Sequence, residues 1–329
     1  MPPAANAAAL ATSRPLVPTA ICLTPDRRFF GPALCVASQI IACGLPDEAD
    51  LFLVCEETDV WPRFEEIDET IRKRLKLAVT SFDDVTRKLP SNNNGEHAIT
   101  RRLFLDRVLP AQYDRIIPVD SDMMIVNEGL APLISLDLEG AVLAAATDMI
   151  SYMDFGGHLA EEFQAYRASL GMTPDTLYFN NGLTVIDRAL WTKAEMGERT
   201  LRFIAANPKL CLRFEQSALN ALLKGGFVRL SPRFNFMGDF MSLDLEEEIR
   251  PNVYHFVNRP KPWQRGWVGD PRYAHAFRDW FAISPWPDFP DVEPVDNHYE
   301  PVNQDFRRRL WSFLETQHFA DGWQPQMSA

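Results

Sequence analysis

Short apolar runs alternate with amphipathic segments along the first part of the chain. The runs at 19–24, 50–55 and 75–80 are short and mostly apolar, which predicts buried strands. Between them, 31–43 has apolar residues at helical spacing, and the charged stretch 65–74 is expected to be a helix. Buried strands separated by helices are typical of a parallel sheet that is covered on both faces. The pattern therefore predicts an α/β domain.

The same alternation continues in the middle of the chain. A helix is expected at 98–109, and further strands are expected at 115–119, 141–146, 177–186 and 252–256. Polar groups follow or interrupt these strands. Because ligands of open α/β sheets bind at the carboxyl ends of the strands, the functional groups are expected at that edge.

The two ends of the chain differ in composition from the middle. The first 18 residues are rich in Ala and Pro and predict a mobile tail, without the basic start of a signal peptide. After about residue 270 the proline-rich stretch 284–294 excludes regular structure, and 302–317 predicts an amphipathic helix. The expected organisation is a tail at 1–18, the main α/β domain at 19–270 and a C-terminal extension at 271–329.

Composition excludes several classes of protein. The 329 residues carry 33 Lys and Arg against 45 Asp and Glu, a formal net charge of −12, which argues against general nucleic-acid binding. No apolar run approaches the roughly 18 residues of a membrane span. The five cysteines form no CxxC pair, which indicates reduced thiols and a cytoplasmic protein.

An acidic pair at the end of one predicted strand is the strongest chemical signal. Asp120 and Asp122 are two residues apart, so on an extended chain both carboxylates point to one side and can share a hard cation. An imidazole such as that of His255 would complete a site for Mn²⁺, with Mg²⁺ as the alternative ion. Lys261, between two prolines, would place a positive charge on a diphosphate.

Each of these motifs also has an ordinary structural explanation. The acidic pair can be a solvated turn, and His255 can be a hydrogen-bonded core residue. The 180–182 Asn-Asn-Gly sequence can be a turn that needs positive φ. Asp148 can be a loop acid, and the 215–216 pair can lie on an exposed helix face.

Taken in order, the motifs resemble glycosyltransferase family 8, the group of bacterial lipopolysaccharide galactosyl- and glucosyltransferases and glycogenin. The resemblance covers roughly residues 19–269. It implies a GT-A fold with a mostly parallel central sheet flanked by helices, a UDP-linked sugar donor, Mn²⁺ and retention of the anomeric configuration. The motifs that carry it are Arg102-Leu103, Asp120-Ser-Asp122, Asp148, Phe179-Asn-Asn-Gly182, Glu215-Gln216, His255 and Lys261-Pro-Trp263.

The resemblance also implies a role for individual residues. The metal ligands would be Asp120, Asp122 and His255. The catalytic residues, around the donor sugar, would be Gln216, Asp148 and Glu215. The donor-binding residues would be Asp26, Phe30, Arg102, Asp120, Ser121, Asn180 and Lys261, with Asp26 and Phe30 in the loop for the nucleotide base.

The implied reaction moves a hexose to a hydroxyl of a saccharide or glycolipid. Gln216 is neutral and a poor nucleophile, which favours a front-face mechanism in which the leaving phosphate takes the acceptor's proton. Two other functions stay open. One is a nucleotidyltransferase that makes a nucleotide sugar, although its usual glycine-rich phosphate loop is poorly matched by Thr24–Gly31. The other is a non-catalytic protein that binds nucleotide sugars.

Some positions depart from the family pattern, and some parts of the chain carry no motif. Asn258 stands where the family usually has glycine, and Glu215 stands where aspartate is commoner. Acceptor contacts are expected in 151–175 and after residue 270. The C-terminal helix carries Arg307–Arg309 beside aromatic residues. It would either touch an anionic membrane peripherally, on the cytoplasmic side, or dock on the domain.

Overall fold

The computed structural model describes residues 16–325 except 83, 85–98, 153–158 and 292–301. Most of the predicted tail therefore lies outside the described residues, as does part of the proline-rich stretch. In the described part of that stretch, 284–291, the chain forms neither helix nor strand. Among the described helices, none combines the length and the apolar character that crossing a membrane requires.

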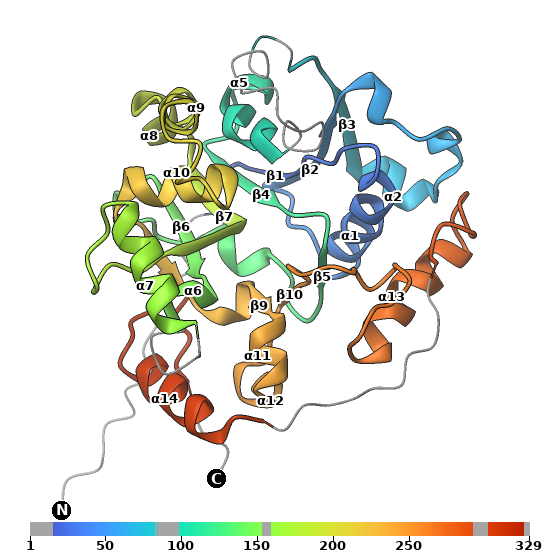
Figure 1. Cartoon of the computed structure of the whole chain (residues 1–329). Helices are drawn as coiled ribbons and strands as arrows, with labels where there is room; N and C mark the ends of the chain where they lie inside the picture. The colour runs from blue at the N-terminus through green and yellow to red at the C-terminus, as the bar shows by residue number, and fades with distance from the viewer. Residues whose placement is uncertain (1–15, 83, 85–98, 153–158, 292–301, 326–329) are drawn as a thin grey trace, which may run out of the picture.

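A seven-stranded sheet forms the centre of the described structure (Figure 1), in the order β3-β2-β1-β4-β7-β6-β8. Its strands are β1 (Thr19–Leu23), β2 (Ala49–Cys55), β3 (Leu75–Val79), β4 (Arg115–Val119), β6 (Leu143–Thr147), β7 (Phe179–Asp187) and β8 (Val228–Leu230). All neighbours are parallel except β7, which runs antiparallel to β4 and to β6. The predicted α/β architecture with a mostly parallel sheet is confirmed.

Alternation along the strands explains why helices cover both faces of this sheet. In β1, Ile21 and Leu23 belong to one buried cluster, while Ala20 and Cys22 belong to another. Side chains alternate between the two faces of a strand, so both faces of β1 must be covered by apolar residues. The first cluster includes the buried face of α1 (Phe30–Ala42). The second includes residues of α8 (Arg188–Lys193), α9 (Met196–Ala206) and α10 (Phe214–Leu223).

Two helices are shorter in the structure than the ranges predicted from the sequence. The stretch 65–74 becomes a 3₁₀ turn at Phe64–Glu66 and then α2 (Glu69–Arg74), because Asp68 accepts a hydrogen bond from the Thr70 amide and starts a new helix. The described part of 98–109 contains the 3₁₀ segment η3 (Arg101–Phe104) and the short helix α5 (Leu105–Val108). The remaining helices in this region are α6 (Met149–Tyr152) and α7 (Ala160–Ser169).

The Asn-Asn-Gly sequence at 180–182 forms part of strand β7 and not a turn. Asn180, Asn181 and Gly182 lie inside this strand, and none of them has positive φ. Because β7 is antiparallel, its first residues meet the carboxyl ends of β4 and β6 at one edge of the sheet. The Asn-Asn-Gly sequence is thus placed beside Asp120 and Asp148. A role as a simple turn would not account for this position.

A smaller sheet and the last helices form a third buried cluster (Figure 1). The sheet has the order β5-β10-β9. The elements are β5 (Met123–Ile125), β9 (Phe236–Met237), β10 (Val253–His255), α11 (Gly238–Ser242), α12 (Glu246–Ile249), α13 (Pro271–Ala282) and α14 (Gln304–Glu315). Helices α13 and α14 contribute apolar residues to the same cluster as β9 and β10. Asp270 caps α13, and the domain boundary expected near 270 stays a prediction.

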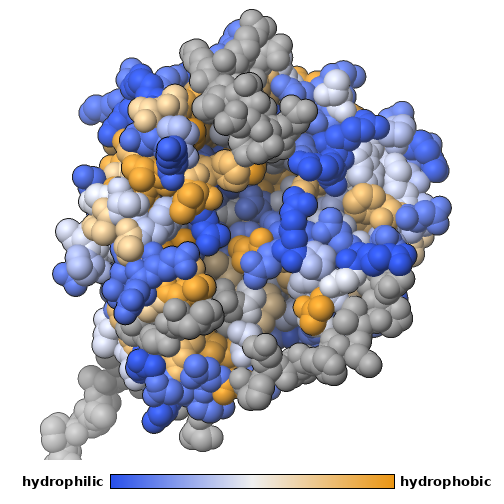
Figure 2. Space-filling view, in the orientation of Figure 1, coloured by the Kyte–Doolittle hydropathy of each residue, from blue (hydrophilic) through white to orange (hydrophobic). Residues whose placement is uncertain are grey.

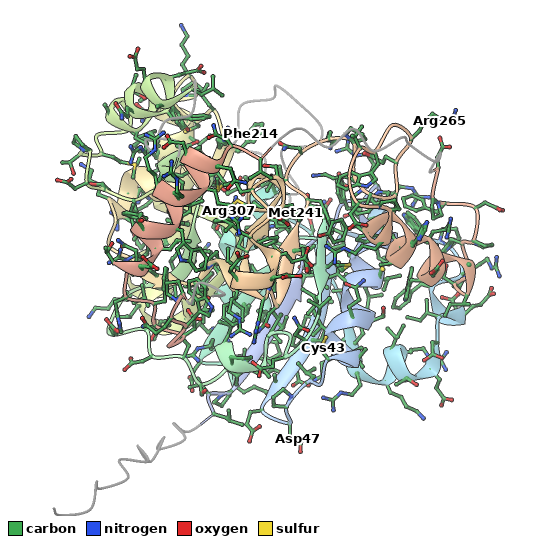
Figure 3. All side chains as sticks on the ribbon, turned by 90° about the horizontal axis from the view of Figure 1, so that it is seen from below. Cys43, Asp47, Phe214, Met241, Arg265 and Arg307 are labelled. Carbon is green, nitrogen blue, oxygen red and sulfur yellow. The ribbon has the colours of Figure 1, made fainter. Side chains whose placement is uncertain are left out.

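Helix α14 docks on the rest of the protein through its apolar face. Its buried residues include Leu310 and Trp311. Arg307 (Figure 3) pairs with Glu248 of α12, and Arg308 and Arg309 both pair with Asp305. These pairs neutralise much of the positive charge that the helix would offer to an anionic membrane, which favours the docking alternative.

Candidate active site

A cleft of about 700 Å³ opens at the edge where the strands of the large sheet end. Figure 2 shows the hollow on the face seen in Figure 1, with both hydrophilic and hydrophobic residues around it. Its walls come from the loop after β1, the residues that follow β4 and β6, and the start of β7. The cleft therefore lies where the sequence places the polar groups.

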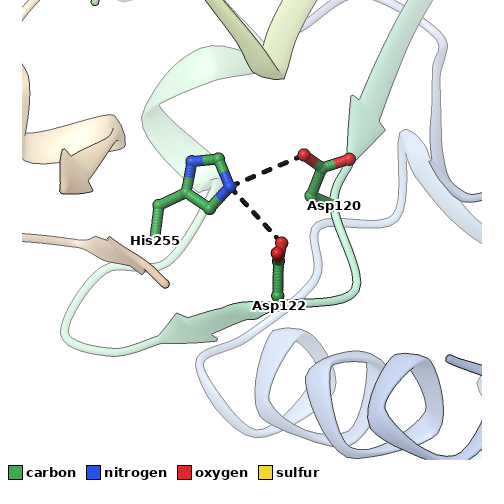
Figure 4. Close-up of side chains that lie close together, drawn as sticks. All are labelled: Asp120, Asp122 and His255. Carbon is green, nitrogen blue, oxygen red and sulfur yellow. Dashed lines mark ion pairs between the residues drawn. The ribbon is translucent and has the colours of Figure 1, made fainter. Parts of the chain in front are cut away.

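Three predicted ligands meet in this cleft (Figure 4). Asp120 follows β4, Asp122 precedes β5, and His255 is the last residue of β10. The His255 Nε2 atom lies 3.5 Å from Asp120 Oδ2 and 3.3 Å from Asp122 Oδ1. Because β5 pairs with β10, with Met123 opposite His255, the acidic pair and the imidazole are held together by backbone pairing.

In both Asp120 and Asp122, one carboxylate oxygen lies near the imidazole and the other pairs with a basic side chain. The second oxygen of Asp120 pairs with Arg102, and the second oxygen of Asp122 lies 2.7 Å from Lys261 Nζ. Lys261 also donates to the carbonyl oxygens of Phe256 and Val257. All three protons of this buried ammonium are thus used within the protein, and a diphosphate would have to replace one of these contacts.

The donor atoms of this group fit a divalent cation. His255 Nδ1 lies 2.8 Å from Asn235 Oδ1, so the Nδ1–H donates to this amide oxygen and Nε2 is the ring atom that faces the two carboxylates. Asn235 is itself fixed by donating to Asn180 Oδ1. One imidazole nitrogen and two carboxylate oxygens are a donor set suited to Mn²⁺ or Mg²⁺.

The same geometry perturbs the pKa values of the group. Burial alone would lower the pKa of His255, but the Asp122 and Asp120 carboxylates outweigh burial and raise it to about 9. His255 and Lys261 in turn hold the pKa of Asp122 well below its usual range, in spite of its burial. The imidazole therefore carries a proton at neutral pH in the metal-free protein, and a cation would compete with that proton.

A second group lies on the β7 side of the cleft. Asp148 Oδ2 accepts hydrogen bonds from Asn180 Nδ2 at 2.8 Å and from Gln216 Nε2 at 3.2 Å. Gln216 Oε1 accepts from the Asn181 amide, and the Asn181 side chain donates to Glu215 Oε1 at 3.3 Å. Asp148, Asn180, Glu215 and Gln216 all line the cleft. The structure thus brings the predicted catalytic residues into one hydrogen-bonded network, and Glu215 is buried, not on an exposed helix face.

Comparison with known proteins decides the family. A sequence model described as "Glycosyl transferase family 8" matches residues 51–266. The chain belongs to this family. Lipopolysaccharide 1,2-glucosyltransferase of Escherichia coli (strain K12) is 25% identical over 267 residues, which cover 77% of this chain and 73% of that protein. General stress protein A of Bacillus subtilis (strain 168) is 26% identical over 234 residues, 63% of this chain and 75% of that protein.

Solved structures of glycosyltransferases share the fold of this family 8 member. The galactosyltransferase LgtC, crystallised with donor and acceptor sugar analogues, superposes with a TM-score of 0.61 at 21% identity, over 78% of this chain and 95% of that one. The bifunctional glycosyltransferase WbbM gives a TM-score of 0.63 at 17% identity, over 83% of this chain and 50% of that one. The predicted GT-A fold is confirmed.

One predicted donor residue lies outside the cleft wall, in the helix that follows the loop after β1. Phe30 does not line the cleft: it starts α1 and is fully buried, packing on Trp61 and Phe64 with ring centroids 6.1 and 5.8 Å away. A helix directs its apolar residues toward the core, so Phe30 points away from the ligand side. Its neighbour Phe29 and the predicted Asp26 line the cleft, where Asp26 pairs with Arg28.

The other predicted donor residues of this glycosyltransferase lie in the cleft. Arg102, Ser121, Asn180 and Lys261 all line it, as does the atypical Asn258. The sequence analysis missed Asn235, which is fully buried and orients His255. The one signal for it in the sequence is a lone amide between apolar residues in a Phe-Asn-Phe stretch, which could not reveal its partner.

Replacing Glu215 by glutamine is expected to change the pH dependence of stability of this family 8 protein. Burial raises the pKa of Glu215 from 4.5 to about 7, against the opposing effect of Arg102. Because the folded protein favours the protonated carboxyl, Glu215 adds its full contribution to the free energy of unfolding below pH 4.5. This contribution is lost as the pH rises through 7. Glutamine does not ionise, so Glu215→Gln avoids this loss of about 3 kcal/mol. The free energy of unfolding of the variant, relative to that of the wild type, should therefore increase between pH 4.5 and 8.

Urea unfolding at a series of pH values, with EDTA present, measures this difference. The exposed Glu315 gives a matched control, because Glu315→Gln should leave the pH dependence of the wild type unchanged. A free-energy difference between Glu215→Gln and the wild type that stays constant from pH 4.5 to 8 would contradict the prediction.

Proposed function

We propose that the protein is a retaining glycosyltransferase that moves a hexose from a UDP-sugar to a hydroxyl of a saccharide or glycolipid. The observation that carries this proposal is the meeting of a candidate metal site, formed by Asp120, Asp122 and His255, with the Asp148–Gln216 network in one cleft. Family membership supports the same reaction class. So do the glucosyltransferase and galactosyltransferase among its relatives and structural neighbours.

The ion proposed for this site is Mn²⁺, with Mg²⁺ as the alternative. Asp120, Asp122 and His255 would hold it, and their buried oxygen and nitrogen atoms fit either ion. When bound, the cation supplies positive charge that stabilises the leaving diphosphate. The same charge would also hold the diphosphate in a protein that only binds nucleotide sugars, so turnover is what separates the two functions.

The residues of the chain would divide the work across the cleft. Arg102 and Lys261 add positive charge next to the acidic pair, where the diphosphate would lie. Asp148, Asn180 and Gln216 would hold the sugar. Gln216 is a neutral amide already bonded on both of its polar atoms, so it is poorly suited to attack the sugar. This favours a front-face reaction in which the acceptor hydroxyl gives its proton to the leaving phosphate.

Acceptor binding is proposed on the wall formed by α6, α7 and α10. Leu159, Phe163 and Phe214 line this wall, and Phe214 is 38% exposed. Part of the expected acceptor loop 151–175 supplies it, although 153–158 lie outside the described residues. Among the described residues the lining of the cleft ends at Lys261, so the proposal gives no acceptor role to the described residues after 270. The ion pairs of α14 give no support to membrane contact, and the proposal does not include it.

A donor screen tests the proposal. Calorimetry with UDP-, GDP- and ADP-linked hexoses, with and without Mn²⁺, should find metal-dependent binding of a UDP-sugar, and that donor should then be slowly hydrolysed. Binding without any turnover, with water or with added saccharides, would favour the non-catalytic alternative. Formation of a nucleotide sugar from a sugar 1-phosphate and UTP would favour the nucleotidyltransferase. A glycosyl-enzyme trapped on Asp148 or Glu215 would contradict the front-face step.

A further inference from the structure

Arg101 occupies a different position from its neighbour Arg102. Both are buried residues of η3, but Arg101 is absent from the cleft wall. Its guanidinium points to two loops that follow strands: Nη1 donates to the Pro25 carbonyl at 3.1 Å and to Asp59 Oδ2 at 2.5 Å, and Nη2 donates to Glu56 Oε2 at 2.8 Å. One planar cation thus joins the loop after β1 to the loop after β2.

The two acids that hold Arg101 are themselves fixed by backbone groups. Asp59 Oδ2 accepts from the Glu56 amide at 3.0 Å, and Glu56 Oε1 accepts from the Phe82 amide, just beyond β3, at 3.2 Å. The Asp59 and Arg101 side chains are only 8% and 6% exposed. The cluster is therefore a hydrogen-bonded, largely buried base at the carboxyl ends of β1, β2 and β3.

The loop after β1 rests on this base. Besides the bond from Arg101 to Pro25, Arg27 donates to the Thr58 carbonyl at 3.0 Å, and Trp61 Nε1 donates to the Arg27 carbonyl. On its other side this loop faces the cleft through Thr24, Pro25 and Asp26. Its distance from the acidic pair is set by the sheet, since β1 lies next to β4.

We propose that Arg101 is a positioning residue for donor binding: with Glu56 and Asp59, it fixes the loop after β1 in the place where that loop contacts the nucleoside part of the donor. This inference rests on the proposed function. Of the groups proposed around the diphosphate, Asp122, His255 and Lys261 share no hydrogen bond with this cluster. Arg102, next to Arg101 in η3, donates instead to the Asn181 carbonyl and to Asp120. Disturbing Arg101 should therefore weaken the hold on the nucleoside and spare the hold on the phosphates.

The variant Arg101→Lys separates these two effects. A lysine keeps the charge but cannot reproduce the planar fork that reaches Pro25, Asp59 and Glu56 together. Calorimetry with Mn²⁺ should show affinity for UDP reduced about tenfold, whereas affinity for pyrophosphate, which lacks the nucleoside, should stay within about twofold of the wild type. In hydrolysis of the UDP-sugar, KM should rise and kcat should be nearly unchanged.

A second buried arginine provides the matched control. Arg115 donates to the carbonyls of Leu133, Ile134 and Leu136 and does not line the cleft. Arg115→Lys should lower the urea midpoint without changing the affinity for UDP. If Arg101→Lys does not fold, Glu56→Gln, which removes the charge from a partly exposed side chain, should give the same selective loss with a smaller factor.

The outcomes are distinguishable. Unchanged UDP affinity in Arg101→Lys, or an equal loss for UDP and pyrophosphate, would overturn the role of Arg101 and leave the proposed function intact. A wild-type protein that binds neither UDP nor pyrophosphate with Mn²⁺ would overturn the proposed function and this inference with it.

Discussion

The variant Asp122→Asn is expected to lose Mn²⁺ binding and transfer activity together. Asp122 gives one oxygen to His255 at 3.3 Å and the other to Lys261 at 2.7 Å, so its charge serves both the ligand group and the neighbouring ammonium. An amide removes one of two anionic ligands, and Mn²⁺ affinity should fall at least about 100-fold. Activity should fall about 10³-fold, because charge stabilisation by a metal is worth several kcal/mol.

The same change also removes the negative charge that faces two buried cations, Lys261 and protonated His255. Breaking such a pair costs about 3–5 kcal/mol, so circular dichroism must first establish that the variant is folded. The control is Asp187→Asn, the same replacement at the far end of β7, where asparagine can still cap α8. Wild-type Mn²⁺ affinity in folded Asp122→Asn, measured by calorimetry or electron paramagnetic resonance, would contradict the proposed ligand set.

The variant Gly182→Ala is expected to lose metal binding and activity through a steric clash alone. Gly182 is in β7 without positive φ, so its backbone accepts alanine, but the new Cβ would lie inside the contact distance of His255 Cε1 and 2.9 Å from Asp120 Oδ2. His255 cannot retreat without losing its bond to Asn235. Both ligands would have to shift, and a displacement of about 1 Å can cost about 100-fold in rate. We expect a loss of at least about 100-fold in activity and in Mn²⁺ affinity.

The control for this substitution is Gly238→Ala at the start of α11, where an added Cβ meets nothing within 4 Å. It should leave metal binding and turnover unchanged. Full activity of Gly182→Ala would mean that the imidazole and the acidic pair do not act as one close group.

Much of the fold could be predicted because it depends on local pattern. The strand at Thr19–Leu23 and the helix at Phe30–Ala42 follow from residues that are close in sequence, and both are confirmed. Helix ends were less predictable, since a single cap at Asp68 was enough to divide the expected helix at 65–74. The direction of β7 could not be predicted at all, because a strand has the same side-chain alternation in either direction.

The candidate site divides in the same way. Asp120 and Asp122 could be paired from their spacing, but the place of His255 beside them depends on the pairing of β10 with β5. Likewise, the partners of Lys261 and the inward direction of Phe30 are set by packing between distant segments.

By itself, then, the sequence determined the α/β class, the order of the motifs and the kinds of ligand atoms available. Only the tertiary structure decided which oxygen of each carboxylate faces the imidazole, that Asn235 orients this imidazole, and that Arg101 supports the loop after β1. The physical reason is range. Backbone preferences and hydrophobic periodicity act over a few residues, whereas hydrogen bonds and ion pairs in a buried site join segments that meet only when the sheets have formed.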